Sequence, residues 1–122
     1  MDNDVFGHLN NAVYYSLFDT AVCARFVGLG ILQRPGARHI LMVAESGCRY
    51  HSEVKYPDPL SVGVRMARLG TSSVRHEIGA FRDGADGACA EGFMVHVCVD
   101  TDTRRPAPMP ADWRTGLTGM KE

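Results

Sequence analysis

A group of polar residues near the N-terminus contains a carboxylate that could act on an electrophilic carbon. Asp4 stands three residues before Gly7 and seven before Asn11. A carboxylate can attack such a carbon directly or act as a general base on water. Gly7 allows a tight backbone turn that a side chain would obstruct. On spacing alone, the more frequent role of such an aspartate is to form a turn by accepting hydrogen bonds from backbone amides.

His8 is the second titratable candidate at this turn, because the unperturbed pKa of histidine is about 6.5. We expect it to shape the turn or line the entrance of a site rather than to transfer protons. Asp2, Asp4 and His8 together offer too few ligands for a metal ion. The sequence therefore predicts no metal site here.

The segment after this turn predicts a helix over residues 12–27, with Asp19 and Arg25 as its only charged residues. Asn10 or Asn11 is a suitable N-cap. The first amides of a helix lack intrahelical partners and carry the positive end of its dipole. The amide of Asn11 is thus a candidate donor to a developing oxyanion. A helix that is apolar almost all round is expected to be covered on several sides.

Beyond this helix the hydrophobic period changes to that of strands. Four are predicted, over residues 39–50, 60–69, 73–82 and 88–99. Short hairpins make neighbouring strands antiparallel. A tail over residues 100–110 and a short helix over 111–117 follow. The fold class is α+β: one domain, residues 1–122, with a long central helix wrapped by an antiparallel sheet. One helix leaves a sheet edge and an apolar surface uncovered, which favours homodimerisation.

The balanced charge of the sequence gives no support to functions that depend on a strong net charge. The 13 basic and 14 acidic residues give a net charge of −1, which provides no field to attract nucleic acid or an anionic membrane. No apolar run is long enough to cross a bilayer, and the N-terminus lacks the pattern of a signal peptide. We expect a cytoplasmic protein. Its four cysteines include no Cys-x-x-Cys pair and are expected to be reduced, small, buried residues.

One segment is specific enough to resemble a known family. Residues 2–14, Asp-Asn-Asp-Val-Phe-Gly-His-Leu-Asn-Asn-Ala-Val-Tyr, resemble the Asp-x-Asp-x-x-Gly-His-Val-Asn-Asn-x-x-Tyr signature of the 4-hydroxybenzoyl-CoA thioesterase family of hotdog proteins. Residues 69–73, Leu-Gly-Thr-Ser-Ser, also look like this family. Asp19 stands where the family usually has Glu, and Leu17 and Val22 depart from its common Phe and Arg.

This resemblance implies a hotdog-fold acyl-CoA thioesterase that cleaves a thioester to a free acid and CoA. It makes Asp4 the nucleophile or general base, while Asn11 helps to polarise the carbonyl. The other residues implied to contact substrate are Gly7, His8, Asn10, Tyr14, Ser72 and Ser73. Tyr14 is otherwise a core aromatic residue. No cofactor is implied, since CoA is part of the substrate. Hotdog sites usually form between two subunits, so a homodimer or homotetramer is implied.

Two related functions stay open. The substrate could be carried by acyl carrier protein instead of CoA, or the chain could be a non-catalytic acyl-CoA-binding module, although the retained Asp4 argues against the latter. The family has a β-strand before the Asp-x-Asp turn, whereas here that turn begins at residue 2. The first strand is therefore expected to be missing, which would mean a truncated N-terminus. The sequence does not predict the acyl group, because that preference depends on pocket depth.

Overall fold

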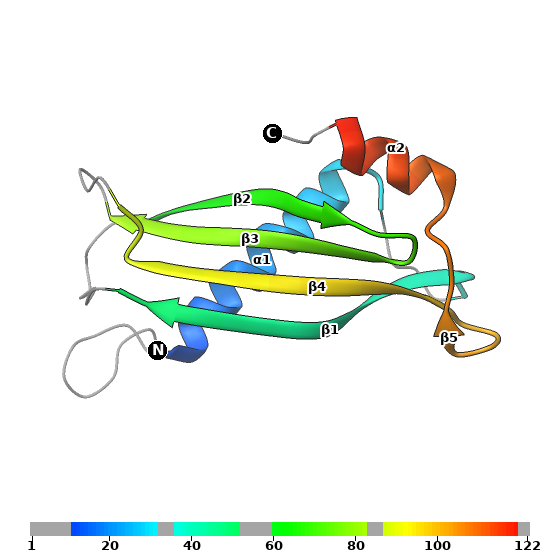
Figure 1. Cartoon of the computed structure of the whole chain (residues 1–122), viewed down its shortest axis with the longest axis horizontal. Helices are drawn as coiled ribbons and strands as arrows, with labels where there is room; N and C mark the ends of the chain where they lie inside the picture. The colour runs from blue at the N-terminus through cyan, green and yellow to red at the C-terminus, as the bar shows by residue number, and fades with distance from the viewer. Residues whose placement is uncertain (1–10, 32–35, 52–59, 83–86, 120–122) are drawn as a thin grey trace.

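The computed structural model describes residues 11–31, 36–51, 60–82 and 87–119, and only the backbone of residues 11–15, 50 and 60. Two helices and five strands follow one another in Figure 1 as α1 (Asn11–Gly28), β1 (His39–Tyr50), β2 (Leu60–Leu69), β3 (Ser73–Arg82), β4 (Ala90–Asp100), β5 (Arg105–Pro106) and α2 (Ala111–Gly119). The predicted bounds of α1 and of the first three strands agree with these to within one residue.

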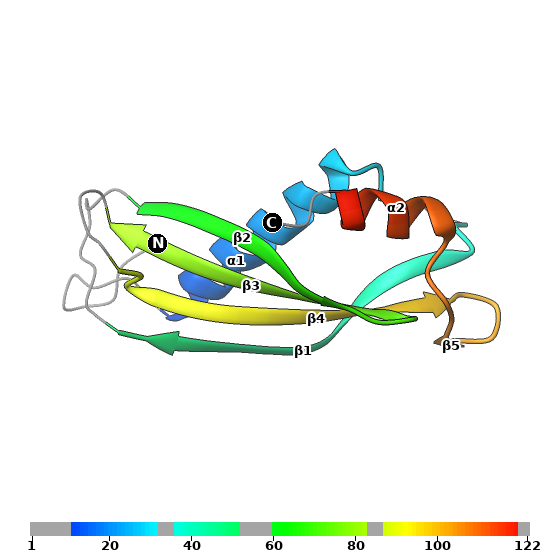
Figure 2. The ribbon, with the colours of Figure 1, turned by 45° about the horizontal axis from the view of Figure 1, so that its top comes forward.

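The strands form one antiparallel sheet in the order β1-β4-β3-β2, with β5 paired to the end of β4. Within the described residues, β1 and β2 are therefore the two long edge strands. Helix α1 crosses one face of the sheet diagonally, and α2 lies beside the C-terminal end of α1 (Figures 1 and 2). This arrangement confirms the α+β class, with a long helix packed on an antiparallel sheet. Among the described residues, no helix is apolar and long enough to span a bilayer.

Helix α1 contacts the sheet along a single stripe. Phe18, Val22 and Phe26 are spaced four residues apart and are almost fully buried, as neighbours on one helical face should be. The prediction that α1 is covered on several sides is wrong for the single chain. Small or polar residues on its far face are exposed because only one sheet packs against the helix; they include Thr20, Cys23 and Ala24.

Alternation along β3 and β4 divides buried side chains on one face of the sheet from half-exposed side chains on the other. In β3, Val74, His76, Ile78 and Ala80 alternate along the strand and are all buried, on the face of the sheet that carries α1. In β4 the buried residues on this face are Met94, His96 and Cys98, and the half-exposed residues on the other face are Phe93, Val95, Val97 and Val99. The face away from α1 therefore carries an uncovered apolar stripe along a central strand.

Glycines let aromatic rings lie against this outer face. A Cβ atom at Gly47 would come within 2.5 Å of Cε1 of Phe93, and one at Gly79 within 3.0 Å of the Phe81 ring. The Phe93 ring thus fills the space over Gly47 on the neighbouring strand β1, an arrangement that compensates glycine in sheets. The Phe81 ring lies over Gly79 of its own strand, β3. The glycines are needed here for close approach.

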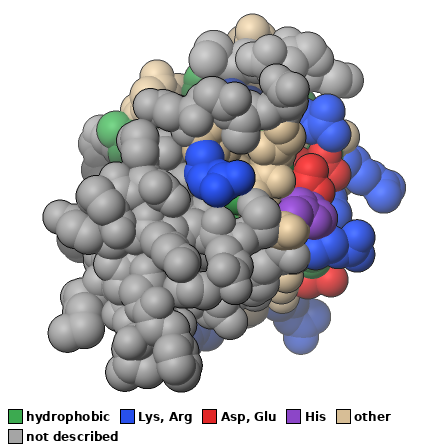
Figure 3. All heavy atoms as spheres, turned by 90° about the vertical axis from the view of Figure 1, so that its left-hand side faces the viewer, with side chains coloured by type: hydrophobic (Ala, Val, Ile, Leu, Met, Phe, Trp, Pro, Cys, Tyr) green, Lys and Arg blue, Asp and Glu red, His purple; other side chains and the backbone are tan. Residues whose placement is uncertain are grey.

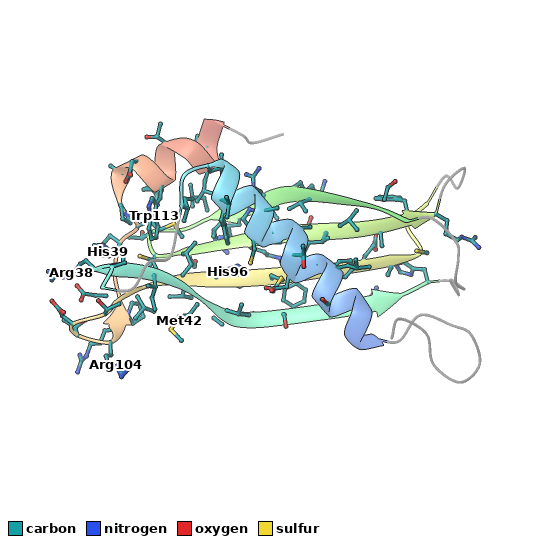
Figure 4. All side chains as sticks on the ribbon, turned by 180° about the vertical axis from the view of Figure 1, so that it is seen from behind. Arg38, His39, Met42, His96, Arg104 and Trp113 are labelled. Atoms are coloured by element: carbon teal, nitrogen blue, oxygen red, sulfur yellow. The ribbon has the colours of Figure 1, made fainter. Side chains whose placement is uncertain are left out.

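The C-terminal segment was predicted to be a tail up to a short helix, and it contains one more element. Arg104 adopts a positive φ of 61°, which turns the chain back so that β5 pairs with Val99 and Asp100. Helix α2 then extends two residues beyond its predicted end. Trp113 and Leu117, four residues apart, anchor it to the core. The ring of Trp113 in α2 packs edge to face against the ring of His39, the first residue of β1 (Figure 4).

Candidate active site

Helix α1 begins at Asn11, one residue before the predicted first helical position. The amides that we predict to polarise a substrate carbonyl are those of the first turn of this helix, at the positive end of its dipole. The remaining residues of the predicted entrance lie outside the described part of the chain: Asp4, Gly7, His8 and Asn10, together with the side chains of Asn11 and Tyr14. Their roles stay predictions.

Ser72 and Ser73 lie in and just after the turn that joins β2 to β3. Both are half-buried. The carbonyl oxygen of Ser72 accepts from the amide of Cys98 at 2.7 Å, and that of Ser73 accepts from the amide of Gly70 at 2.7 Å. Neither hydroxyl makes a hydrogen bond to another described residue. The backbone of this turn is therefore fixed, while its two hydroxyls stay available to a ligand.

The two predicted parts of the site do not meet within one chain. The N-terminal end of α1 and the turn between β2 and β3 lie at opposite ends of the sheet in Figures 1 and 2. A single site that used Asn11 and Ser72 would therefore need a second copy of the chain.

A buried polar cluster lies under the C-terminal half of α1. The Nε of Arg25 donates to Nε2 of His76 at 2.9 Å, and the ring of Phe26 packs edge-on against both His76 and His96. Burial, then the nearby Arg25 and then His96, lower the pKa of His76 to about 4. Burial also lowers the pKa of His96, against the opposing effect of Asp19. Figure 4 shows His96 beneath the helix.

This cluster makes His76 a buried histidine that is hydrogen-bonded to the helix. Arg25 and His96 were not predicted to join it. The available signal was weak: an arginine in an otherwise apolar helical segment, and a histidine that alternates with buried neighbours on the next strand. The cluster lies about three to four helical turns from Asn11, so the geometry gives it a structural position rather than a place at the entrance of α1.

The outer face of the sheet carries an open groove of about 1170 Å³ that reaches across the four long strands. Its rim is charged: Arg65 pairs with Glu77 at 2.6 Å, and the guanidinium of Arg75 lies 4.1 Å from the centre of the Phe93 ring. At one end of the sheet, shown in Figure 3, basic, acidic and histidine side chains lie side by side. Arg65 already has a carboxylate partner, so a substrate phosphate would have to displace Glu77 from it.

No described group of three or more His, Cys, Asp and Glu residues is placed to hold a metal ion. The four cysteines are free thiols. Cys89 and Cys98 are buried as predicted and Cys48 is half-buried, but the prediction is wrong for Cys23. Cys23 is exposed because it lies on the uncovered face of α1, where its thiol faces Asp19 at 3.8 Å.

Comparison with known proteins adds an independent line of evidence. The thioesterase-like superfamily matches residues 1–117. The PA5185 protein of Pseudomonas aeruginosa is 40% identical, with a TM-score of 0.88 over 99% of this chain and 85% of its own. A Thermus thermophilus thioesterase crystallised with coenzyme A and Zn is 31% identical, with a TM-score of 0.82 over 98% of this chain and 86% of its own.

A third structure supports the fold. The 1,4-dihydroxy-2-naphthoyl-CoA thioesterase Slr0204 of Synechocystis is 15% identical, with a TM-score of 0.87 over 96% of this chain and 88% of its own. The predicted hotdog fold is thereby confirmed. No curated protein matches the sequence.

Proposed function

Because this chain belongs to the thioesterase-like superfamily, we propose that it is an acyl-CoA thioesterase that releases a free acid and CoA. The observation that carries the proposal is the family match over residues 1–117, which includes the polar segment before α1. The 31% identity to a thioesterase crystallised with coenzyme A supports CoA as the thiol part of the substrate. We also propose a cytoplasmic location, where such thioesters are made and used.

In the proposed mechanism, Asp4 is either the nucleophile or the general base. Its carboxylate attacks the thioester carbon, the thiolate of CoA leaves, and water then hydrolyses the resulting mixed anhydride. Alternatively, the same carboxylate removes a proton from the water that attacks the thioester. In either route negative charge develops on the carbonyl oxygen. The amides at the start of α1, beginning near Asn11, are the donors suited to stabilise it.

The complete site is proposed to form between two copies of the chain. Strand β1 is a long edge strand, and it exposes 52% of Met42 and 50% of Val43. Exposed apolar residues on an edge strand favour pairing of that edge with another chain. Antiparallel pairing of two β1 strands reverses one sheet relative to the other. The Ser72 turn of one copy then lies at the end of the assembly where α1 of the other copy begins.

A panel of acyl-CoA thioesters tests the proposed reaction. Release of the free thiol is followed for short, long and aromatic acyl groups, with the same acyl groups on acyl carrier protein run in parallel. Hydrolysis of at least one acyl-CoA well above the uncatalysed rate is expected. If only the thioesters carried by acyl carrier protein are hydrolysed, the substrate is acyl carrier protein thioester and not acyl-CoA. Tight binding of acyl-CoA without any turnover would instead identify a binding module, and neither binding nor turnover would refute the proposal.

A further inference from the structure

The turn from Gly70 to Ser73 uses every one of its backbone carbonyls. Those of Ser72 and Ser73 accept from β4 and from within the turn, as described above. The carbonyl of Thr71 accepts from the amide of Met109 at 3.0 Å. The carbonyl of Gly70 accepts from Nη1 of Arg114 at 2.7 Å, and the same nitrogen lies 3.5 Å from the carbonyl of Thr71. The C-terminal segment therefore holds the first half of this turn.

Arg114 is itself held in place by the helix that carries it. Its neighbour Trp113 and the next-turn residue Leu117 are 9% and 0% exposed, so α2 is fixed to the core on both sides of Arg114. Gly116 packs against the chain that leaves α1, since a Cβ atom there would lie 3.5 Å from the carbonyl oxygen of Leu29. Because α2 is fixed, the half-buried side chain of Arg114 holds the carbonyls of Gly70 and Thr71 in place.

A charged, rigid donor on two successive carbonyls restrains a turn more than a neutral or flexible one. The turn is the end of a hairpin, where backbone motion is normally greatest. The hydroxyls of Ser72 and Ser73 make no hydrogen bond to the described residues. Their positions therefore depend on the backbone of the turn, and this is why its restraint matters. A hydroxyl that is displaced makes a weaker hydrogen bond to substrate, because hydrogen bonds weaken with distance and misalignment.

We propose that Arg114 is a positioning residue that holds the turn between β2 and β3 in the conformation in which Ser72 and Ser73 bind the acyl-CoA substrate. This inference rests on the proposed thioesterase function. It assigns α2 a role in substrate binding although α2 lies at the opposite end of the sheet from the start of α1. Arg114 does not touch the reacting atoms in this account, so it should affect substrate binding and not the chemical step.

Three variants test this role in the full chain: Arg114→Gln, which removes the charge; Arg114→Lys, which keeps a charged nitrogen but not the planar guanidinium; and Thr115→Ala as the control. Thr115 is exposed, and its hydroxyl donates within α2, to the carbonyl of Ala111 at 2.9 Å. The measurements are kcat and KM for the best acyl-CoA, the affinity for CoA by calorimetry, amide hydrogen exchange at residues 70–73, and the melting temperature.

For Arg114→Gln we expect KM to rise about tenfold while kcat stays within about twofold, because binding and not chemistry is impaired. Exchange at residues 70–73 should accelerate, and the CoA affinity should weaken in parallel with KM. Arg114→Lys should fall between Arg114→Gln and the unmutated protein, and Thr115→Ala should behave as the unmutated protein.

Faster exchange at the turn with an unchanged KM would overturn the positioning role and leave the thioesterase function intact. An equal loss in Thr115→Ala, or a loss of kcat that follows a lowered melting temperature, would also overturn it, because α2 would then be only structural. If the unmutated protein neither binds CoA nor hydrolyses any acyl-CoA, the proposed function fails and this inference fails with it.

Discussion

Arg25 in α1 donates a hydrogen bond to His76 in β3, from Nε to Nε2 over 2.9 Å. A guanidinium stays protonated and has no acceptor, so Nε2 of His76 must accept and the ring proton lies on Nδ1. The folded chain therefore holds His76 neutral, fully buried beside a cation and next to His96. This pair ties the helix to the sheet in a way that depends on pH.

Stability should fall as pH falls through the range in which unfolded histidine is protonated. The pKa of His76 is about 4 in the folded chain against an ordinary 6.5. Between these values the unfolded chain binds more protons, so acidification favours unfolding. The stabilisation is complete above about pH 6.5 and is lost towards pH 4, with an upper limit of about 3 kcal/mol. Urea unfolding at several pH values between 4 and 7.5 measures the slope.

Two variants isolate this effect from the titration of carboxylates. His76→Gln should flatten the dependence of unfolding free energy on pH between 6.5 and 4.5. His51→Gln is the control, since His51 is exposed and its side chain pairs, among the described residues, with the surface residue Glu91 at 2.9 Å. An unchanged slope in His76→Gln would show that another group governs the acid sensitivity.

Gly92→Ala should destabilise the chain. A Cβ atom at Gly92 would lie 2.8 Å from the carbonyl oxygen of Gly47 and 2.8 Å from Cε2 of Phe18. Because a paired backbone oxygen cannot move aside, we expect a loss of about 1–3 kcal/mol in unfolding free energy. Gly28→Ala, which meets no atom within 4 Å, is the matched control and should be neutral or slightly stabilising. Equal stability of the two variants in urea would contradict the packing described here.

Val43→Lys should weaken self-association. Val43 is 50% exposed on the edge strand β1, and a buried lysine at a strand pair would be costly. Sedimentation velocity should show a shift towards the monomer, and hydrolysis should fall with it. Val27→Lys places the same charge at an exposed valine of α1, 61% exposed, and should leave the assembly unchanged. The reverse pattern would move the interface from the edge of the sheet to the helix.

A mixing experiment tests whether one site uses two chains. Asp4→Asn removes the proposed catalytic carboxylate, and Ser72→Trp blocks the turn between β2 and β3. If each site takes Asp4 from one copy and Ser72 from the other, every mixed dimer retains one intact site. Co-expression should then recover about a quarter of the unmutated activity, since half of the dimers are mixed. No recovery in confirmed mixed dimers would mean that the two residues do not share a site across the interface.

The sequence predicted the fold well where local pattern decides it. The strand predicted over residues 73–82 coincides with β3, and the asparagines at positions 10 and 11 located the start of α1. The element that local pattern missed is β5, because it depends on the positive φ of Arg104 and on pairing with β4. A two-residue strand has no periodicity of its own.

Tertiary packing explains the other differences. An apolar composition cannot tell which sides of α1 the sheet covers, so the exposure of Cys23 was not foreseen. The contacts of Arg25 with His76 and of Arg114 with Gly70 join residues more than 40 positions apart. For the site, the resemblance selected Ser72 and Ser73, but only the structure shows that their turn lies at the opposite end of the sheet from Asn11.

The rate of thioester hydrolysis by Asp4→Asn, beside that of Asp2→Asn, tests whether this carboxylate performs the reaction. With the best acyl-CoA, we predict that kcat of Asp4→Asn falls by at least about 100-fold, while its melting temperature and CoA affinity match the unmutated protein. Asp2→Asn removes a neighbouring carboxylate and should keep its activity. Full turnover by Asp4→Asn would contradict the proposed mechanism.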